Sequence, residues 1–121
     1  MALIFVVEDE PILLDLIATF LRLGGDEVKA NRGPIAAYEA IIAARTPVDL
    51  LLIEADLKPI SGFQLVNRLR GKRINCPVIF MSSHHGVAAI LTESLGRRAV
   101  IEKPFTATEL RTAVRASLAA E

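Results

Sequence analysis

Three acidic side chains follow two short apolar runs of this 121-residue sequence. Glu8 and Asp9 follow a run that starts at Ala2, and Glu54 follows Leu50–Ile53, which is four consecutive aliphatic residues. Carboxylates held about 5 Å apart repel one another by roughly 3 kcal/mol per pair at an effective dielectric constant of 20. Without a cation, at least one of them should have a raised pKa. Such a cluster suits Mg²⁺, which prefers carboxylate, backbone carbonyl and water oxygens.

A hydroxyl and an ammonium group follow two later apolar runs. Ser82 comes directly after Pro77–Met81, and Lys103 comes shortly after Ala99–Ile101. Both side chains can bind an anion that the metal also contacts, such as a phosphoryl group. Acids for a metal, an acid for attack, and Lys with Ser for the phosphoryl oxygens together predict an aspartyl-phosphate type of site.

Strands and helices are predicted to alternate strictly along the chain. The predicted strands are Ala2–Val7, Glu27–Ala30, Asp49–Ile53, Pro77–Met81 and Ala99–Ile101. This α/β pattern favours a parallel sheet covered by helices on both faces, and right-handed crossovers bring the carboxyl ends of all strands to one edge. We therefore expect the acids, the serine and the lysine to meet at that edge.

Proline, glycine and hydroxyl residues mark the ends of the five expected helices. The helices are predicted to start at Pro11, Gly33-Pro34, Ser61, Val87 and a last cap that is either Thr106 or Thr108. The first four are predicted to end at Gly24-Gly25, near Thr46-Pro47, at Gly71 and at Leu95 before Gly96. His84 and His85 are adjacent and fall in a predicted loop, so we expect exposed side chains and not metal ligands.

Composition favours one globular domain over residues 1–121. Hydrophobic residues make up 52% of the chain, and 14 basic residues balance 14 acidic ones, which gives no reason to expect nucleic-acid binding. No apolar stretch approaches the roughly 18 residues of a membrane span, and the first apolar run is too short for a signal peptide. We therefore expect a cytoplasmic protein with no membrane contact. Cys76 is the one cysteine and is predicted to be a buried or half-buried thiol.

Taken in order, these motifs resemble the receiver domain of two-component response regulators over the whole chain. The resemblance rests on IFVVEDEP, DLLLIEADL with the following P and G, PVIFMSS and EKPF. It implies a flavodoxin-like (βα)5 doubly wound fold with strand order 2-1-3-4-5. It also implies a signalling module, not an enzyme, that works with a histidine kinase or a phosphotransfer protein.

The resemblance also assigns roles to individual residues. Glu8 and Asp9 match the acidic metal-binding pair, and the backbone carbonyl of Asp56 would complete the Mg²⁺ ligands with the side chain at position 54. Ser82 matches the hydroxyl residue that contacts the phosphoryl group, and Lys103 matches the invariant lysine. The Lys103-Pro104 peptide bond is expected to be cis, which is a minority state for X-Pro bonds.

Two positions of the resemblance carry different residues here. Glu54 stands where the family has its phosphoacceptor aspartate, and Val100 stands where the family commonly has Tyr or Phe. A glutamate reaches about one methylene further than an aspartate, so it could approach Lys103 and Ser82 while holding about one negative charge where an acyl phosphate holds nearly two. A valine has a stiff χ1 and no ring, so it weakens a rotamer-based switch. The loop proline also falls one place late, with Lys58 in its usual position.

We therefore expect a stand-alone or excised receiver-like domain in which Glu54 partly mimics the phosphorylated state and weakens Mg²⁺ binding. Its output would be contact with another protein through the fourth helix, fifth strand and fifth helix, and a homodimer is possible. One alternative is a working phosphoacceptor that uses Glu54 or Asp56. Others are a plain structural salt bridge between Glu54 and Lys103, and a small Mg²⁺-dependent phosphohydrolase in which Glu54 positions water. A flavodoxin-like cofactor carrier is disfavoured, because acids after the first strand would repel its phosphate.

Overall fold

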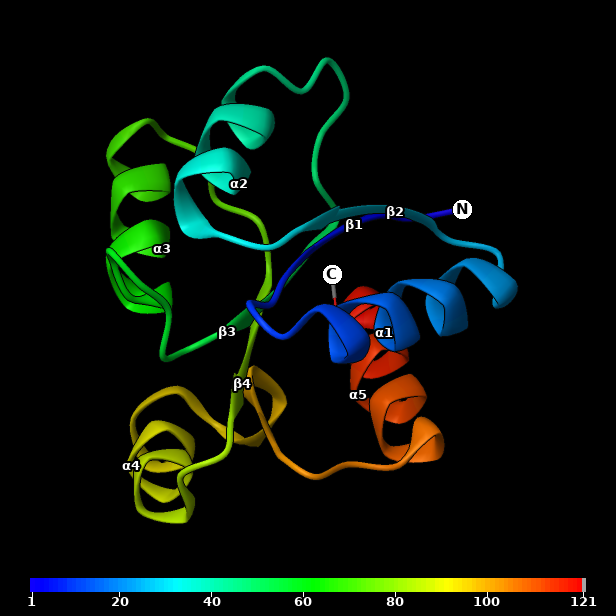
Figure 1. The fold of residues 1–121 in the computed structure, drawn as a ribbon, viewed down its shortest axis with the longest axis vertical. Coiled ribbons are helices and arrows are strands. Elements are labelled where there is room, and N and C mark those ends of the chain that lie inside the picture. The colour runs from blue at the N-terminus through cyan, green and yellow to red at the C-terminus, as the bar shows by residue number, and fades with distance from the viewer. Residues whose placement is uncertain (121) are drawn as a thin grey trace.

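The computed structural model describes residues 1–120, in which five short strands form one parallel sheet in the order β2-β1-β3-β4-β5 (Figure 1). The strands are β1 Leu3–Val7, β2 Glu27–Asn31, β3 Leu50–Glu54, β4 Val78–Ser82 and β5 Val100–Glu102. All four neighbouring pairs run parallel, so the strand order and direction match the order 2-1-3-4-5 that the resemblance implies.

Helices cover both faces of the sheet. They are α1 Pro11–Leu23, α2 Pro34–Ile42, α3 Gly62–Gly71, α4 His85–Leu95 and α5 Ala107–Ala119, with a short 3₁₀ turn, η1 Arg97–Ala99, before β5. Helices α1 and α5 pack together on one face, while α2, α3 and α4 contribute to the core on the other (Figure 1). None of the helices in the described part of the chain is both long and apolar enough to cross a membrane.

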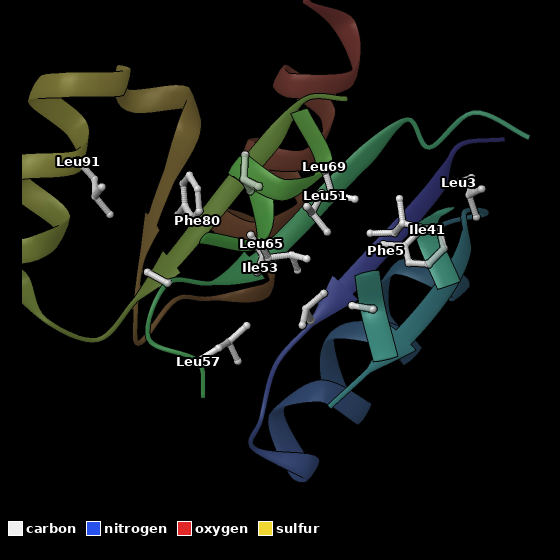
Figure 2. Packing of buried hydrophobic residues seen from close by; sticks show 14 residues of the cluster. Leu3, Phe5, Ile41, Leu51, Ile53, Leu57, Leu65, Leu69, Phe80 and Leu91 are labelled. Atoms are coloured by element: carbon white, nitrogen blue, oxygen red, sulfur yellow. The ribbon is translucent and has the colours of Figure 1, made fainter. Parts of the chain in front are cut away.

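The two central strands are buried on both faces because their side chains alternate between two apolar layers. Phe5 and Leu51 point into the layer formed with α2, α3 and α4, where Figure 2 shows them among the aliphatic side chains of that core. Ile4 and Leu52 point into the opposite layer, against α1 and α5. Burial of every residue of β3 explains why this strand reads as an uninterrupted apolar run.

Most predicted element boundaries are confirmed to within two residues. Ser61 caps α3 in a capping box with Gln64, and Thr106, not Thr108, caps α5 in the same way with Glu109. The second helix was predicted to run to near Thr46, which is wrong because it ends at Ile42. The fourth helix begins at His85 and not at Val87, so the prediction that His85 belongs to a loop is also wrong.

The fifth strand is shifted from its predicted range, Ala99–Ile101, to Val100–Glu102. Ala99 belongs instead to the 3₁₀ turn, where its backbone N–H donates to the carbonyl of Gly96 at 3.2 Å. Gly96 has a φ of 91°, a conformation that glycine adopts at little cost. This turn sets the register in which Ser82 pairs with Glu102, next to Lys103.

Gly62 lets the start of α3 lie directly against the end of β3. A Cβ at this position would stand 2.5 Å from the backbone oxygen of Glu54 and 3.2 Å from the Cα of Ala55. The Gly62 N–H donates to the Ala55 carbonyl at 3.0 Å, so the close approach is also a hydrogen-bonded one. Because Gly62 has no side chain, the start of α3 can pack directly against the backbone that carries Glu54.

We predict that Gly62→Ala lowers the free energy of unfolding by about 1–3 kcal/mol, because the new methyl group must displace backbone. Gly71→Ala is the matched control in the same helix, since a Cβ there meets nothing within 4 Å. Urea unfolding should show a change of no more than about 1 kcal/mol for the control, in the stabilising direction. Equal effects of the two substitutions would show that the close approach at Gly62 has no energetic importance.

Candidate functional site

The Lys103 ammonium joins two buried carboxylates at the carboxyl edge of the sheet. Lys103 Nζ donates to Glu8 Oε1 at 2.6 Å and also forms a short hydrogen bond with Glu54 Oε1. The side chain of Lys103 is 15% exposed, that of Glu8 is 1% exposed and that of Glu54 is 7% exposed. The prediction that residues from β1, β3 and the end of β5 meet at one edge is therefore confirmed, and the approach of Glu54 to Lys103 is confirmed with it.

The second oxygen of each carboxylate is held by a backbone N–H group. Glu8 Oε2 accepts from Glu10 N at 3.0 Å, and Glu54 Oε2 accepts from Asp56 N, also at 3.0 Å. Each carboxylate thus has one oxygen on the lysine and one on the chain two residues later. These contacts make every oxygen of the pair a hydrogen-bond acceptor and fix both side-chain orientations.

Local structure after β5 brings Lys103 to this position. The backbone N–H of Lys103 donates to the carbonyl of Ser82 at 2.7 Å, which continues the β4–β5 ladder by one residue. The Lys103-Pro104 peptide bond is cis, as the resemblance implies. A second cis bond, Lys58-Pro59, lies in the loop after β3 and was not foreseen from the sequence.

Ser82 lies at the same edge, but its hydroxyl is bonded elsewhere. Ser82 Oγ accepts from His84 N at 3.2 Å and lies 3.3 Å from the His84 carbonyl oxygen, to which it donates. The residue is buried, and this pair of bonds closes the turn between β4 and α4. No hydrogen bond joins Glu54 to Ser82 among the described residues, and the hydroxyl instead stabilises the turn.

The remaining predicted metal ligands adjoin the buried pair, since the Asp9 side chain hydrogen-bonds to Glu8 and raises its pKa, and the Asp56 N–H bonds to Glu54. Asp9 and Asp56 are both exposed, whereas Glu8 and Glu54 are buried. Within residues 1–120, no group of three or more His, Cys, Asp or Glu side chains gathers in a way that could hold a metal ion. As arranged, the donor set does not fit Mg²⁺, because the two buried carboxylates are directed at an ammonium and at backbone N–H groups. The roles assigned to these residues as metal ligands remain predictions.

Burial and ion pairing shift two pKa values at the site. Burial raises the pKa of Glu8 above its ordinary value, and the hydrogen bond from Lys103 opposes this shift only in part. For Lys103, burial acts to lower the pKa, but hydrogen bonds to Glu54 and Glu8 outweigh it and leave the pKa raised. The lysine is therefore a cation at neutral pH, and the site keeps a positive charge between its two acids.

A side-chain hydrogen bond between α4 and β5 was missed by the sequence reasoning. His85 Nδ1 lies 2.9 Å from Glu102 Oε2, and the histidine side chain is 86% exposed. Val100, the position of the expected switch residue, is half-buried on the same strand and packs against the core that contains Phe80. Val100 is the register partner of Phe80 in the neighbouring strand β4. The His85 contact could not be predicted, because it depends on where α4 begins.

Comparisons with known proteins agree on one family. The model of the response regulator receiver domain matches residues 4–115. The response regulator protein PmrA of Pseudomonas aeruginosa is 32% identical over 114 residues, which cover 93% of this chain and 51% of that protein. The sensory transduction protein RegX3 of Mycolicibacterium smegmatis is 32% identical over 120 residues, covering 98% and 51%. The chain thus spans about half the length of these curated relatives.

A solved structure supports the fold. The response regulator receiver domain protein from Clostridium thermocellum has a TM-score of 0.84 and 22% sequence identity, with 98% of this chain and 95% of that chain covered. At this level of identity the likeness concerns the path of the chain. It agrees with the parallel sheet in the order β2-β1-β3-β4-β5.

We predict that Lys103→Met lowers the free energy of unfolding by about 3–5 kcal/mol near pH 7, because it leaves two buried carboxylates without their cation. The loss should shrink as the pH falls. A carboxyl group whose folded-state pKa is raised contributes stability below its ordinary value, 4.5 for Glu8, and that contribution is lost as the pH rises through the folded-state pKa. Lys103→Met removes an interaction that lowers the Glu8 pKa, so the folded-state pKa of Glu8 rises further. The pH range in which protonated Glu8 contributes stability then extends to higher pH.

Urea unfolding of both proteins at pH 5.0 and 7.5 is the measurement. The control is Lys29→Met, because Lys29 pairs with Glu27 at 3.6 Å with both side chains more than half exposed. Such a surface pair should contribute no more than about 1 kcal/mol. A Lys103→Met loss that equals the control, or that grows toward pH 5, would contradict the buried ion-pair description.

Proposed function

The chain belongs to the response regulator receiver domain family, and we propose that it is a receiver-like signalling module whose acceptor position, Glu54, is engaged by Lys103 and is not phosphorylated. The observation that carries this proposal is the bond between the Lys103 ammonium and a buried Glu54 carboxylate. In this proposal the chain acts by binding other proteins and has no catalytic turnover. No step of it passes through Mg²⁺.

The surroundings of Glu54 support the absence of phosphorylation. An acceptor carboxylate must present an oxygen to the incoming phosphoryl group. Here one oxygen lies on Lys103, the other accepts the Asp56 N–H, and the side chain is 7% exposed. Attack by Glu54 would have to use an oxygen that already accepts a hydrogen bond inside a nearly closed site, which disfavours it.

The same contacts support a partial likeness to a phosphorylated receiver. In the family, the invariant lysine interacts with the phosphoryl group, and in this chain Lys103 interacts with a carboxylate one methylene longer than aspartate. The likeness is partial in two respects. Glu54 carries about one negative charge, whereas an acyl phosphate carries nearly two, and Ser82 is bonded to His84 and not to the acceptor position.

A surface made by α4, β5 and α5 is the proposed site of partner contact. Val87, Ile90 and Leu95 of α4 are 40%, 64% and 50% exposed. The α4 helix is tied to β5 by the His85–Glu102 pair, beside a groove of about 470 Å³. Exposed apolar side chains on a helix that also borders a groove fit a protein partner. The partner would be a histidine kinase, a phosphotransfer protein or a downstream protein, with no nucleic acid bound by this domain.

A working phosphoacceptor is the second candidate, and the position of Asp56 favours it. The Asp56 carboxylate is exposed in the loop directly after β3, two residues from Glu54 and therefore close to the site. An exposed carboxylate can reach a small phosphodonor without breaking the Lys103 pairs. Under this candidate Asp56, and not Glu54, would take the phosphoryl group.

The intact mass of the protein after incubation with Mg²⁺ and acetyl phosphate tests the proposal. We expect the native chain to gain no phosphoryl group, because both Glu54 oxygens are engaged, and we expect Glu54→Asp to gain one. Asp56→Asn, alone and combined with Glu54→Asp, is the matched control. It should change neither result.

A phosphoryl group on the native chain would contradict the proposal, and its loss in Asp56→Asn would assign the acceptor to Asp56. No phosphoryl group on Glu54→Asp would mean that the loop with Lys58 and its cis Pro59 differs from working receivers in more than the acceptor. In that case the domain is a binding scaffold without a latent phosphorylation site.

A further inference from the structure

Helix α1 carries a line of apolar side chains on its outer side. Ile12, Leu16 and Leu23 are 72%, 63% and 82% exposed, and Thr19 between them is also exposed. These positions follow one another at intervals of four, three and four residues. This is the spacing of a seam along which one helix packs against another. We call Ile12, Leu16, Thr19 and Leu23 the α1 seam.

The α1 seam lies opposite the side of the helix that packs on the sheet. The buried residues of α1 are Leu14, Ile17, Ala18 and Leu21, which fill the inner layer with α5. At 3.6 residues per turn, the seam lies about half a turn away from them. A helix that served only the fold would be polar on that outer side, so an apolar seam indicates a second contact.

A groove extends the apolar surface from the α1 seam toward α5. It has a volume of about 270 Å³ and is lined by Leu13, Leu16, Phe20 and Phe105, among other apolar residues. Residues of both α1 and α5 line this groove, and Figure 1 shows these two helices on the same side of the sheet. The guanidinium carbon of Arg111 lies over the Phe20 ring, 4.8 Å from the ring centroid. Leu16 belongs to both the seam and the groove, so the two form one continuous surface.

Charged residues beside the α1 seam are complementary to a second copy of the same helix. Asp15 and Arg22 are both exposed and are seven residues apart, so they lie on the same flank of α1. In a two-fold pair of antiparallel helices each flank meets itself. An axis near Ala18 then places Asp15 opposite Arg22 of the second copy, twice, and Ile12 opposite the second copy's Leu23. Within residues 1–120, Asp15 forms no ion pair of its own.

We propose that α1 is the contact through which two copies of this chain associate, as an antiparallel pair with the α1 seam at its centre. This inference does not depend on the state of Glu54, and it concerns a different surface from the one made by α4, β5 and α5. A 13-residue helix is about 20 Å long, so the contact is small and the association is weak. The occupant is a second copy because the flanking charges match each other under two-fold symmetry.

Sedimentation equilibrium of the whole chain between about 5 and 500 µM tests the proposal, because weak association through a small contact shows only at high concentration. The mass should rise from 13.1 kDa toward twice that value. Leu16→Asp and Leu23→Asp, measured separately, should each weaken association at least tenfold. Each variant should therefore stay near the monomer mass. Both residues are exposed, so thermal unfolding should confirm that the variants fold. Ile35→Asp is the matched control, because it places the same charge on an exposed residue of α2, outside both proposed contact surfaces, and should leave association unchanged.

A native chain that stays monomeric across this range would overturn the proposal, and would leave the α1 seam to a helix of another protein. Association that survives Leu16→Asp but is lost in Ile35→Asp would also overturn it and would place the contact on α2.

A charge exchange tests the antiparallel register. Asp15→Arg alone and Arg22→Asp alone should each associate at least tenfold more weakly, because like charges then meet across the axis. An equimolar mixture of the two variants should associate again, since both basic positions of one copy would then face acidic positions of the other. A mixture that remains monomeric would overturn the register. Arg22 NH2 donates to the Val28 carbonyl at 2.9 Å, so the thermal midpoint of Arg22→Asp is measured alongside.

Discussion

Two buried carboxylates and one ammonium must balance each other at the carboxyl edge of this sheet, and the rest of the site depends on that balance. Glu8 and Glu54 come from neighbouring central strands, where neither side chain can reach water to any extent. Two acids so placed would repel each other, and Lys103 removes that repulsion by bonding to both. The backbone N–H groups of Glu10 and Asp56 hold the other oxygens, which leaves little freedom for either acid.

The fold supplies this balance through a few local features. The ladder between β4 and β5 extends to Lys103 N, and the close approach of Gly62 fixes the backbone at Glu54. These features place the lysine and the acceptor position on facing sides of one small site. The Glu54 side chain extends far enough to meet Lys103 directly, and in the function we propose its carboxylate takes the place of a transferred phosphoryl group.

Much of this arrangement could be predicted from the sequence, and the exceptions have physical causes. Apolar runs with acids after them indicated the strands and the edge at which Glu54 and Lys103 meet, because parallel strands share one carboxyl edge. Ser82 was placed correctly, but its bonds to His84 depend on a turn geometry that residue types do not determine. The start of α4 at His85 was missed for a similar reason, since no capping side chain marks it. Exposure of Leu16 could not be inferred either, because helical spacing identifies an apolar residue but not which of two apolar sides faces the sheet.

A double-mutant cycle between Glu54 and Lys103 tests the central claim most directly. The free energies of unfolding of the native chain, Glu54→Gln, Lys103→Met and the double variant give the coupling between the two side chains. A buried, hydrogen-bonded ion pair predicts a coupling of about 2 kcal/mol or more, and the exposed Lys29–Glu27 pair, measured in the same way, should give about 1 kcal/mol or less. A Glu54–Lys103 coupling below about 0.5 kcal/mol would contradict the account, because the lysine would then not hold the acceptor position in solution.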